Sequence, residues 1–152
     1  MADDGKIEVG GRFFDFAAPT LKGEEVRLSG LINSKVVLLQ FWGIRCAPCL
    51  AEFSFLADVQ QRYGEKGLQV IGVNTDRVEA DELLQAMGVR NLNPPYPTVL
   101  DPDFDISKYY TNYLIPVSVL IDREGVIQTI HTGYKPKLDA LIVGQVERCL
   151  ER

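Results

Sequence analysis

Two cysteines three positions apart, Cys46 and Cys49, are the residues of this 152-residue chain whose types and spacing best suit chemistry. Residues at that spacing share one face of a helix, so their sulfurs can approach closely enough for an unstrained disulfide. Such a pair can exchange electrons with the thiols and disulfides of other molecules. The same spacing also serves zinc sites and structural disulfides, so the pair alone leaves three alternatives open.

The surrounding sequence predicts that the pair lies where a strand passes into a helix. Residues 35–42 (KVVLLQFW) form a nearly continuous apolar run, which is typical of a strand buried on both faces. We expect a helix over about 47–63, ended by Gly64 and Gly67. Its apolar side chains recur every three to four residues, at Phe53, Leu56, Val59 and Tyr63.

A helix start favours a thiolate at Cys46. Its unpaired N–H groups and partial positive charge stabilise an anion, so we expect Cys46 to ionise more readily than a free cysteine. Arg45, directly beside it, adds positive charge. Pro48 suits the first helical turn, where its missing N–H costs nothing, and it stiffens the segment between the two sulfurs.

The other expected elements first alternate strand with helix and then end in a hairpin. They cover residues 68–73 (strand), 78–87 (helix, stopped by Gly88), 98–100 (strand), 106–110 (helix), 117–121 and 126–130 (strands) and 138–150 (helix). A further hairpin is expected around 21–26. The final helix should bury one face, formed by Leu138, Leu141, Ile142, Val146 and Cys149. This order predicts an α/β fold whose mixed central sheet has helices on both faces.

Composition limits the partners and the organisation of the chain. A net charge of −5 and the lack of any Lys/Arg cluster argue against a nucleic-acid partner. No run approaches the roughly 20 apolar residues that cross a bilayer, and the polar first residues do not resemble a signal peptide. We expect a flexible segment over residues 1–8 and one domain over 9–152. The chain is then either cytosolic or a mature domain that has lost a leader or anchor.

From about Val9 to Leu150 the chain resembles the thioredoxin superfamily, and more narrowly the TlpA/ResA-type thiol–disulfide oxidoreductases, which are exported or membrane-tethered. The matching features are Gly11–Phe16 with Pro19, Phe41-Trp42 before the cysteine pair, Glu52 after it, Val73-Asn74, and Ile121–Gly125. The resemblance implies a thioredoxin-like fold with an N-terminal hairpin and a central insertion within residues 68–100. It also implies no cofactor and no metal, only a redox-active disulfide between Cys46 and Cys49.

The same resemblance assigns residues around the pair. Residues 113–117 match the loop that carries a cis-proline in the superfamily, which makes Pro116 that proline. Its role would be to expose the Ile115 backbone for pairing with the substrate. The expected wall of the site consists of Trp42, Arg45, Pro48, Ile115 and Pro116.

Three positions depart from the pattern, one of them Ser54, where a proline is often seen after Glu52. Arg45 stands where a tryptophan is usual, and Gln40 stands where plain thioredoxin has a buried aspartate, so that proton acceptor is missing. Asp76 or Glu79, just after the expected strand 68–73, could serve as the proton shuttle instead.

The resemblance implies an enzyme that reduces protein disulfides, of the cytochrome c maturation type or similar. Cys46 would attack the partner disulfide and Cys49 would resolve the mixed disulfide. The expected partners are protein disulfides or thiols and a membrane or periplasmic electron donor, and we expect a monomer. The expected location is extracytoplasmic, with the cytoplasm left open. A thiol oxidase or isomerase, a Cu(I)-binding chaperone that uses Cys46 and Cys49, and a thiol peroxidase are the alternatives.

Overall fold

The computed structural model describes residues 6–152, and its centre is a five-stranded sheet with the strand order β5-β4-β3-β6-β7. The strands are β3 (Val36–Trp42), β4 (Leu68–Asn74), β5 (Thr98–Leu100), β6 (Val117–Ile121) and β7 (Ile127–Thr132). Strands β3, β4 and β5 run parallel, whereas β6 pairs antiparallel with β3 and β7 pairs antiparallel with β6. The mixed sheet expected from the sequence is therefore confirmed.

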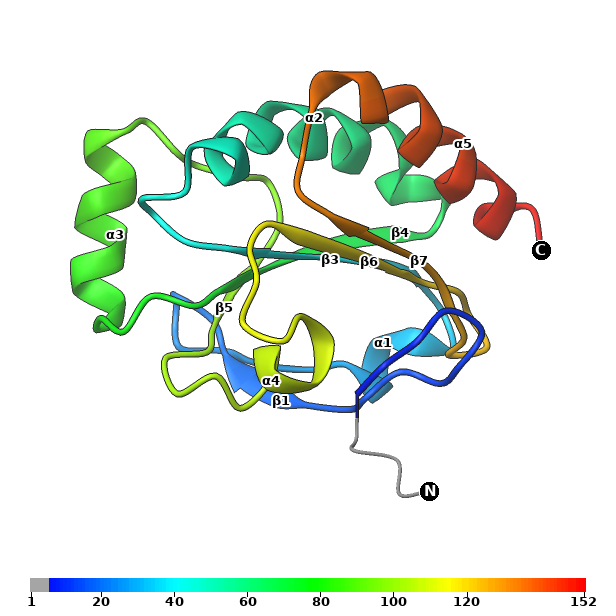
Figure 1. The fold of residues 1–152 in the computed structure, drawn as a ribbon, viewed down its shortest axis with the longest axis horizontal. Helices are drawn as coiled ribbons and strands as arrows, with labels where there is room; N and C mark the ends of the chain where they lie inside the picture. The colour runs from blue at the N-terminus through cyan, green and yellow to red at the C-terminus, as the bar shows by residue number, and fades with distance from the viewer. Residues whose placement is uncertain (1–5) are drawn as a thin grey trace.

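Helices cover both faces of this sheet (Figure 1). On one face lie α2 (Ala47–Tyr63) and α5 (Asp139–Leu150), and on the other lie α1 (Ser29–Ile32), α4 (Ser107–Tyr110) and the hairpin of β1 (Ala17–Pro19) and β2 (Glu25–Arg27). Helix α3 (Ala80–Val89) stands beside the β5 end of the sheet. None of the helices within residues 6–152 is long and apolar enough to cross a membrane.

Strand β3 connects the two layers of the core. All seven of its residues are buried. Because side chains alternate along a strand, Leu39 and Phe41 pack with Tyr110 on the hairpin face, while Leu38 packs with Leu56 under α2. Burial on both faces fixes the position of β3, and the chain leaves its end directly into the turn before α2.

Several predicted boundaries are confirmed and others shift. Helix α2 spans the predicted residues 47–63, and Gly67, which follows it, has the left-handed φ of +111°. Gly88 was wrongly expected to stop α3, which includes it and ends at Val89. The positive φ that follows α3 belongs to Asn91, so the turn does not need a glycine at 88.

The last two elements also differ from the expectation. Strand β7 starts one residue later than predicted and runs to Thr132. Leu141, expected on the buried face of α5, is 49% exposed. The buried stripe is the narrower set Ile142, Val146 and Cys149, whose steps of four and three residues follow one face of the helix.

The expected flexible segment 1–8 falls largely on residues 1–5, which lie outside the described residues. Of the rest, Ile7 donates a backbone hydrogen bond to the Tyr109 carbonyl at 3.1 Å and packs against the core cluster on the hairpin face. Gly10 and Gly11 exchange backbone hydrogen bonds with Ile127, so the chain joins the outer edge of β7 from this point.

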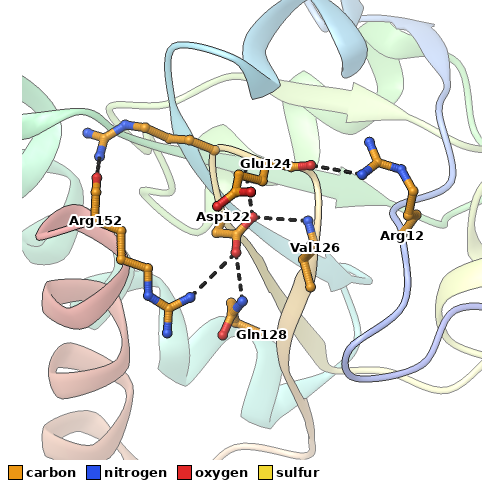
Figure 2. Close-up of polar contacts among 7 residues, drawn as sticks. Arg12, Asp122, Glu124, Val126, Gln128 and Arg152 are labelled. Atoms are coloured by element: carbon orange, nitrogen blue, oxygen red, sulfur yellow. Dashed lines mark hydrogen bonds and ion pairs between the residues drawn. The ribbon is translucent and has the colours of Figure 1, made fainter.

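A buried carboxylate, Asp122, organises the turn between β6 and β7. It is 4% exposed, and its Oδ1 accepts the backbone N–H groups of Glu124 and Val126 at 2.9 and 3.0 Å. Its Oδ2 accepts the Gln128 amide at 2.7 Å and forms an ion pair with Arg152 at 3.5 Å (Figure 2). One side chain thus ties the β6–β7 hairpin to the segment after α5.

Replacing Asp122 by alanine should lower the free energy of unfolding by about 2–3 kcal/mol, because two backbone N–H groups and an amide lose their acceptor. Asp122→Asn, which keeps the Oδ1 acceptor, should lose less than half of that. Urea unfolding at constant m-value measures both. A loss below about 0.5 kcal/mol in Asp122→Ala, the range of ordinary surface substitutions, would contradict this account of the turn.

Candidate active site

Cys46 and Cys49 form a disulfide at the start of α2, with their Cα atoms 5.2 Å apart. Cys46 is the N-cap residue in an extended conformation, and Pro48 lies in the first helical turn. The Cys49 backbone N–H points at Cys46 Sγ, 3.3 Å away. Cys46 is partly exposed, whereas Cys49 is fully buried. The strand-to-helix placement predicted from the sequence is confirmed.

The loop before the disulfide is held by the end of β4. Asp76 Oδ2 accepts the Ile44 backbone N–H at 2.8 Å and the Asn74 side-chain amide at 2.9 Å. Asn74 in turn accepts the Asp76 N–H at 3.0 Å and is itself fully buried. Of the two acidic residues expected near the site, Asp76 therefore lies against the active-site loop. Glu79 is the exposed N-cap residue of α3, and no contact described for residues 6–152 joins it to that loop.

A second loop carries the expected cis-proline. The Ile115–Pro116 peptide bond is cis, as the resemblance implied. Ile115 Cδ1 lies 3.1 Å from where a Cβ on Gly43 would stand, so this loop touches the active-site loop at a position that only glycine leaves free. Three consecutive apolar residues of the second loop are exposed: Tyr113 by 57%, Leu114 by 54% and Ile115 by 37%.

The residues expected to form the wall take different positions. Trp42 is fully buried and packs edge-on against Phe53, with ring centroids 4.8 Å apart. It belongs to the same buried cluster as Cys49, so it supports the disulfide from inside. Arg45 and Pro48 are exposed and flank Cys46 on the surface.

One buried acid in this region had no predicted role. Glu52, one turn after Cys49, is 1% exposed, and its carboxylate accepts hydrogen bonds from Gln40 Nε2 and Ser118 Oγ, each at 3.1 Å. The pKa of Glu52 is raised to about 7, mainly by burial and to a smaller extent by nearby Asp139, against the lowering effect of the two hydrogen bonds. The sequence signal that could have predicted its burial is its position next to Phe53, on the face of α2 that carries the apolar residues.

The remaining cysteine and the single histidine of the sequence make other contacts. Cys149 is buried in the core cluster between α2 and α5, and His131 Nε2 lies 2.9 Å from Gln145 Oε1. Within residues 6–152, no three His, Cys, Asp or Glu side chains are grouped so that they could hold a metal ion.

The comparison with known proteins places this geometry in a family. The AhpC/TSA family model matches residues 9–130, which include the cysteine pair and the cis-proline. The chain belongs to the AhpC/TSA family, within the thioredoxin superfamily. A curated relative is the thiol–disulfide oxidoreductase ResA of Bacillus thuringiensis subsp. konkukian, 32% identical over 82% of this chain and 70% of the relative.

Solved structures agree with this family placement. A candidate thiol:disulfide interchange protein DsbE from Chlorobium tepidum is 29% identical, with a TM-score of 0.87 over 95% of this chain and 99% of that one. A candidate protein disulfide isomerase from Bacteroides thetaiotaomicron is 31% identical, with a TM-score of 0.84 over 96% and 92% of the two chains. This AhpC/TSA-family protein is thus a thioredoxin-like thiol–disulfide oxidoreductase with a cysteine pair of the expected kind.

The raised pKa of Glu52 gives this AhpC/TSA-family protein a defined pH dependence of stability. Between the ordinary value of 4.5 and about 7, the folded state keeps a proton that the unfolded state releases. The stability contributed by protonated Glu52 is therefore fully present below its unfolded-state pKa. It is lost as the pH rises through its folded-state pKa. Glu52→Gln should raise the free energy of unfolding of the oxidised protein by about 1–3 kcal/mol at pH 8 and leave it unchanged at pH 4.

Urea unfolding of the wild type and Glu52→Gln at both pH values measures this difference. Glu65, an exposed acid that follows α2, supplies the matched control, and Glu65→Gln should change stability by less than about 0.5 kcal/mol at either pH. A Glu52→Gln variant that is less stable than the wild type at pH 8 would show that the buried carboxyl is not destabilised by its surroundings.

Proposed function

We propose that this oxidoreductase reduces disulfides in partner proteins, with Cys46 as the nucleophile. The observation that carries the proposal is the unequal exposure of the two sulfur-bearing residues. Cys46 is partly exposed at the helix start, whereas Cys49 is fully buried behind it. An incoming disulfide can therefore reach Cys46 first, and Cys49 is placed to react only with the sulfur of Cys46.

The reduced enzyme would act in two exchange steps. The Cys46 thiolate attacks one sulfur of the partner disulfide, forming a mixed disulfide and releasing the other partner sulfur as a thiolate. The Cys49 thiolate then attacks Cys46 Sγ, which restores the Cys46–Cys49 disulfide and releases the second partner sulfur. Two electrons pass from the enzyme to the partner, and the two partner thiolates take up protons.

Glu52 is the group that we assign as proton acceptor for Cys49. A carboxyl whose pKa lies near 7 can both take and return a proton at neutral pH. It follows Cys49 by three residues on the same buried face of α2, and Gln40 links the two through hydrogen bonds. Asp76, already bonded to Ile44 and Asn74, is better suited to hold the active-site loop.

The cis-proline loop would hold the partner. The exposed run Tyr113–Ile115 offers an apolar surface beside the active-site loop, which suits a partner whose cysteine is flanked by apolar side chains. Pro116 would expose the Ile115 backbone for strand-like pairing with an extended partner segment. Arg45 and Pro48 would line the other side of Cys46.

The likeness to ResA and DsbE supports a narrower assignment. We place the protein outside the cytoplasm, as a monomer that receives electrons from a membrane or periplasmic donor. Its substrates would be protein disulfides of the kind reduced during cytochrome c maturation.

Cysteine substitutions test this function directly. Cys46→Ser should abolish reduction of a protein disulfide such as that of insulin, because the attacking sulfur is gone. Cys49→Ser should instead accumulate a mixed disulfide through Cys46, visible by mass under non-reducing conditions.

Cys149→Ser is the matched control, because Cys149 packs in the core between α2 and α5, and this variant should keep wild-type activity. A Cys46→Ser variant with full activity would end the proposed mechanism.

A further inference from the structure

Gln40 occupies an unusual place in the active site. It is the fifth residue of β3, is fully buried, and lies in register with Ser118 on β6. Its Nε2 donates one hydrogen to the Cys49 carbonyl and one to Glu52 Oε1, each at 3.1 Å. A single amide group therefore contacts both the buried cysteine and the buried acid.

The orientation of this amide is fixed by its partners. The Cys49 carbonyl can only accept a hydrogen bond, so the amide nitrogen and not the amide oxygen must face it. The second hydrogen of the same nitrogen is then directed at Glu52. Gln40 Oε1 is left buried with no hydrogen-bond partner among residues 6–152, and a buried unpaired acceptor is destabilising. If the amide were turned over, Gln40 Oε1 would face the Cys49 carbonyl oxygen, and two acceptors cannot form a hydrogen bond. The observed orientation is therefore favoured.

Gln40 is connected to the reactive sulfur of Cys46 through the backbone of Cys49. The Cys49 carbonyl is held by Gln40, and the Cys49 N–H points at Cys46 Sγ, 3.3 Å away. Cys49 is therefore held on both sides, and the donor that faces Cys46 depends on the position of the Cys49 backbone. The carboxylate of Glu52 contacts the same Gln40 nitrogen that holds the Cys49 carbonyl.

We propose that Gln40 is a positioning residue of the disulfide exchange, one that couples the charge on Glu52 to the reactivity of the Cys46–Cys49 pair. The inference deepens the proposed function and rests on it for the role of Cys46. An ionised Glu52 makes a strong, charge-assisted bond to Nε2 and fixes the amide against Cys49. A protonated Glu52 bonds Nε2 more weakly, which frees Gln40 and loosens the Cys49 backbone.

The pH dependence in this proposal belongs to Glu52 and to the groups around it. Ser118 donates to Glu52 from β6, and Asp139 acts on it from α5. Tyr96, before β5, and Tyr134, after β7, are phenols whose pKa values are raised, first of all by burial, and Glu52 raises both further. Both phenols stay neutral where Glu52 titrates, so they add no charge in that range.

A double-mutant cycle separates coupling through Gln40 from coupling through space. The rate of alkylation of reduced Cys46 by iodoacetamide is measured against pH in the wild type and in Glu52→Gln. The same pair is then compared in a Gln40→Met background, which keeps the side-chain length but removes the amide. Ser118→Ala is the matched control background, because it removes the other hydrogen bond to Glu52 and leaves the contact with Cys49.

In the wild-type and Ser118→Ala backgrounds, Glu52→Gln should change the alkylation rate near pH 7 by about tenfold, the equivalent of one pKa unit. In the Gln40→Met background the change should fall below about threefold. An undiminished effect in Gln40→Met would overturn the proposal and show that Glu52 acts through space.

Thermal unfolding checks that each variant is folded before its rates are compared. If Gln40→Met does not fold, Gln40→Asn replaces it in the same cycle, because its shorter amide cannot reach both acceptors, and the same two outcomes apply. Alkylation needs no partner protein. A failure of this proposal can therefore be told apart from a failure of the proposed function, which the cysteine substitutions test with a protein disulfide.

Discussion

The first turn of α2 works under one constraint: its N–H groups must face a reactive sulfur while its inner side remains buried. Strand β3 meets that constraint because it is buried along its whole length and so presents a fixed surface under the helix. Cys46 lies at the exposed end of the turn, and Cys49 lies on its buried side. The burial that shields Cys49 also encloses the polar groups beside it, so each of those groups needs a partner from the same small region.

Gln40 and Glu52 show that this need is met only in part. A carboxyl that is 1% exposed is destabilised when charged, and two hydrogen bonds only partly offset that effect, which leaves its pKa near 7. The stability lost by burying an acid is thus linked to a useful property, since a carboxyl poised near neutrality can exchange protons. Such sites often combine local instability with function, and the unpaired Gln40 Oε1 is a further sign of the same compromise.

Much of the fold and the position of the disulfide follow from sequence because their signals are local. The apolar run of β3 and the periodicity of α2 specify the junction, and the family resemblance specifies the cis bond before Pro116. The role of Gln40 could not be predicted in this way. Its identity suggested only that a proton acceptor was missing, whereas its contacts with Cys49 and Glu52 depend on how α2 packs on β3. Leu141 was misplaced for a related reason, since packing against the sheet decides the width of a buried helix face.

The most direct test of the central claim is the equilibrium between dithiol and disulfide forms of the Cys46–Cys49 pair in graded thiol buffers, read by mass after alkylation. The account predicts full, reversible cycling with a midpoint near or below that of thioredoxin, about −270 mV, as expected for a protein that donates electrons. A midpoint near about −120 mV, typical of a strong oxidant, would contradict the direction of electron flow proposed for this enzyme. A pair that failed to cycle at all would contradict the redox role of the site itself.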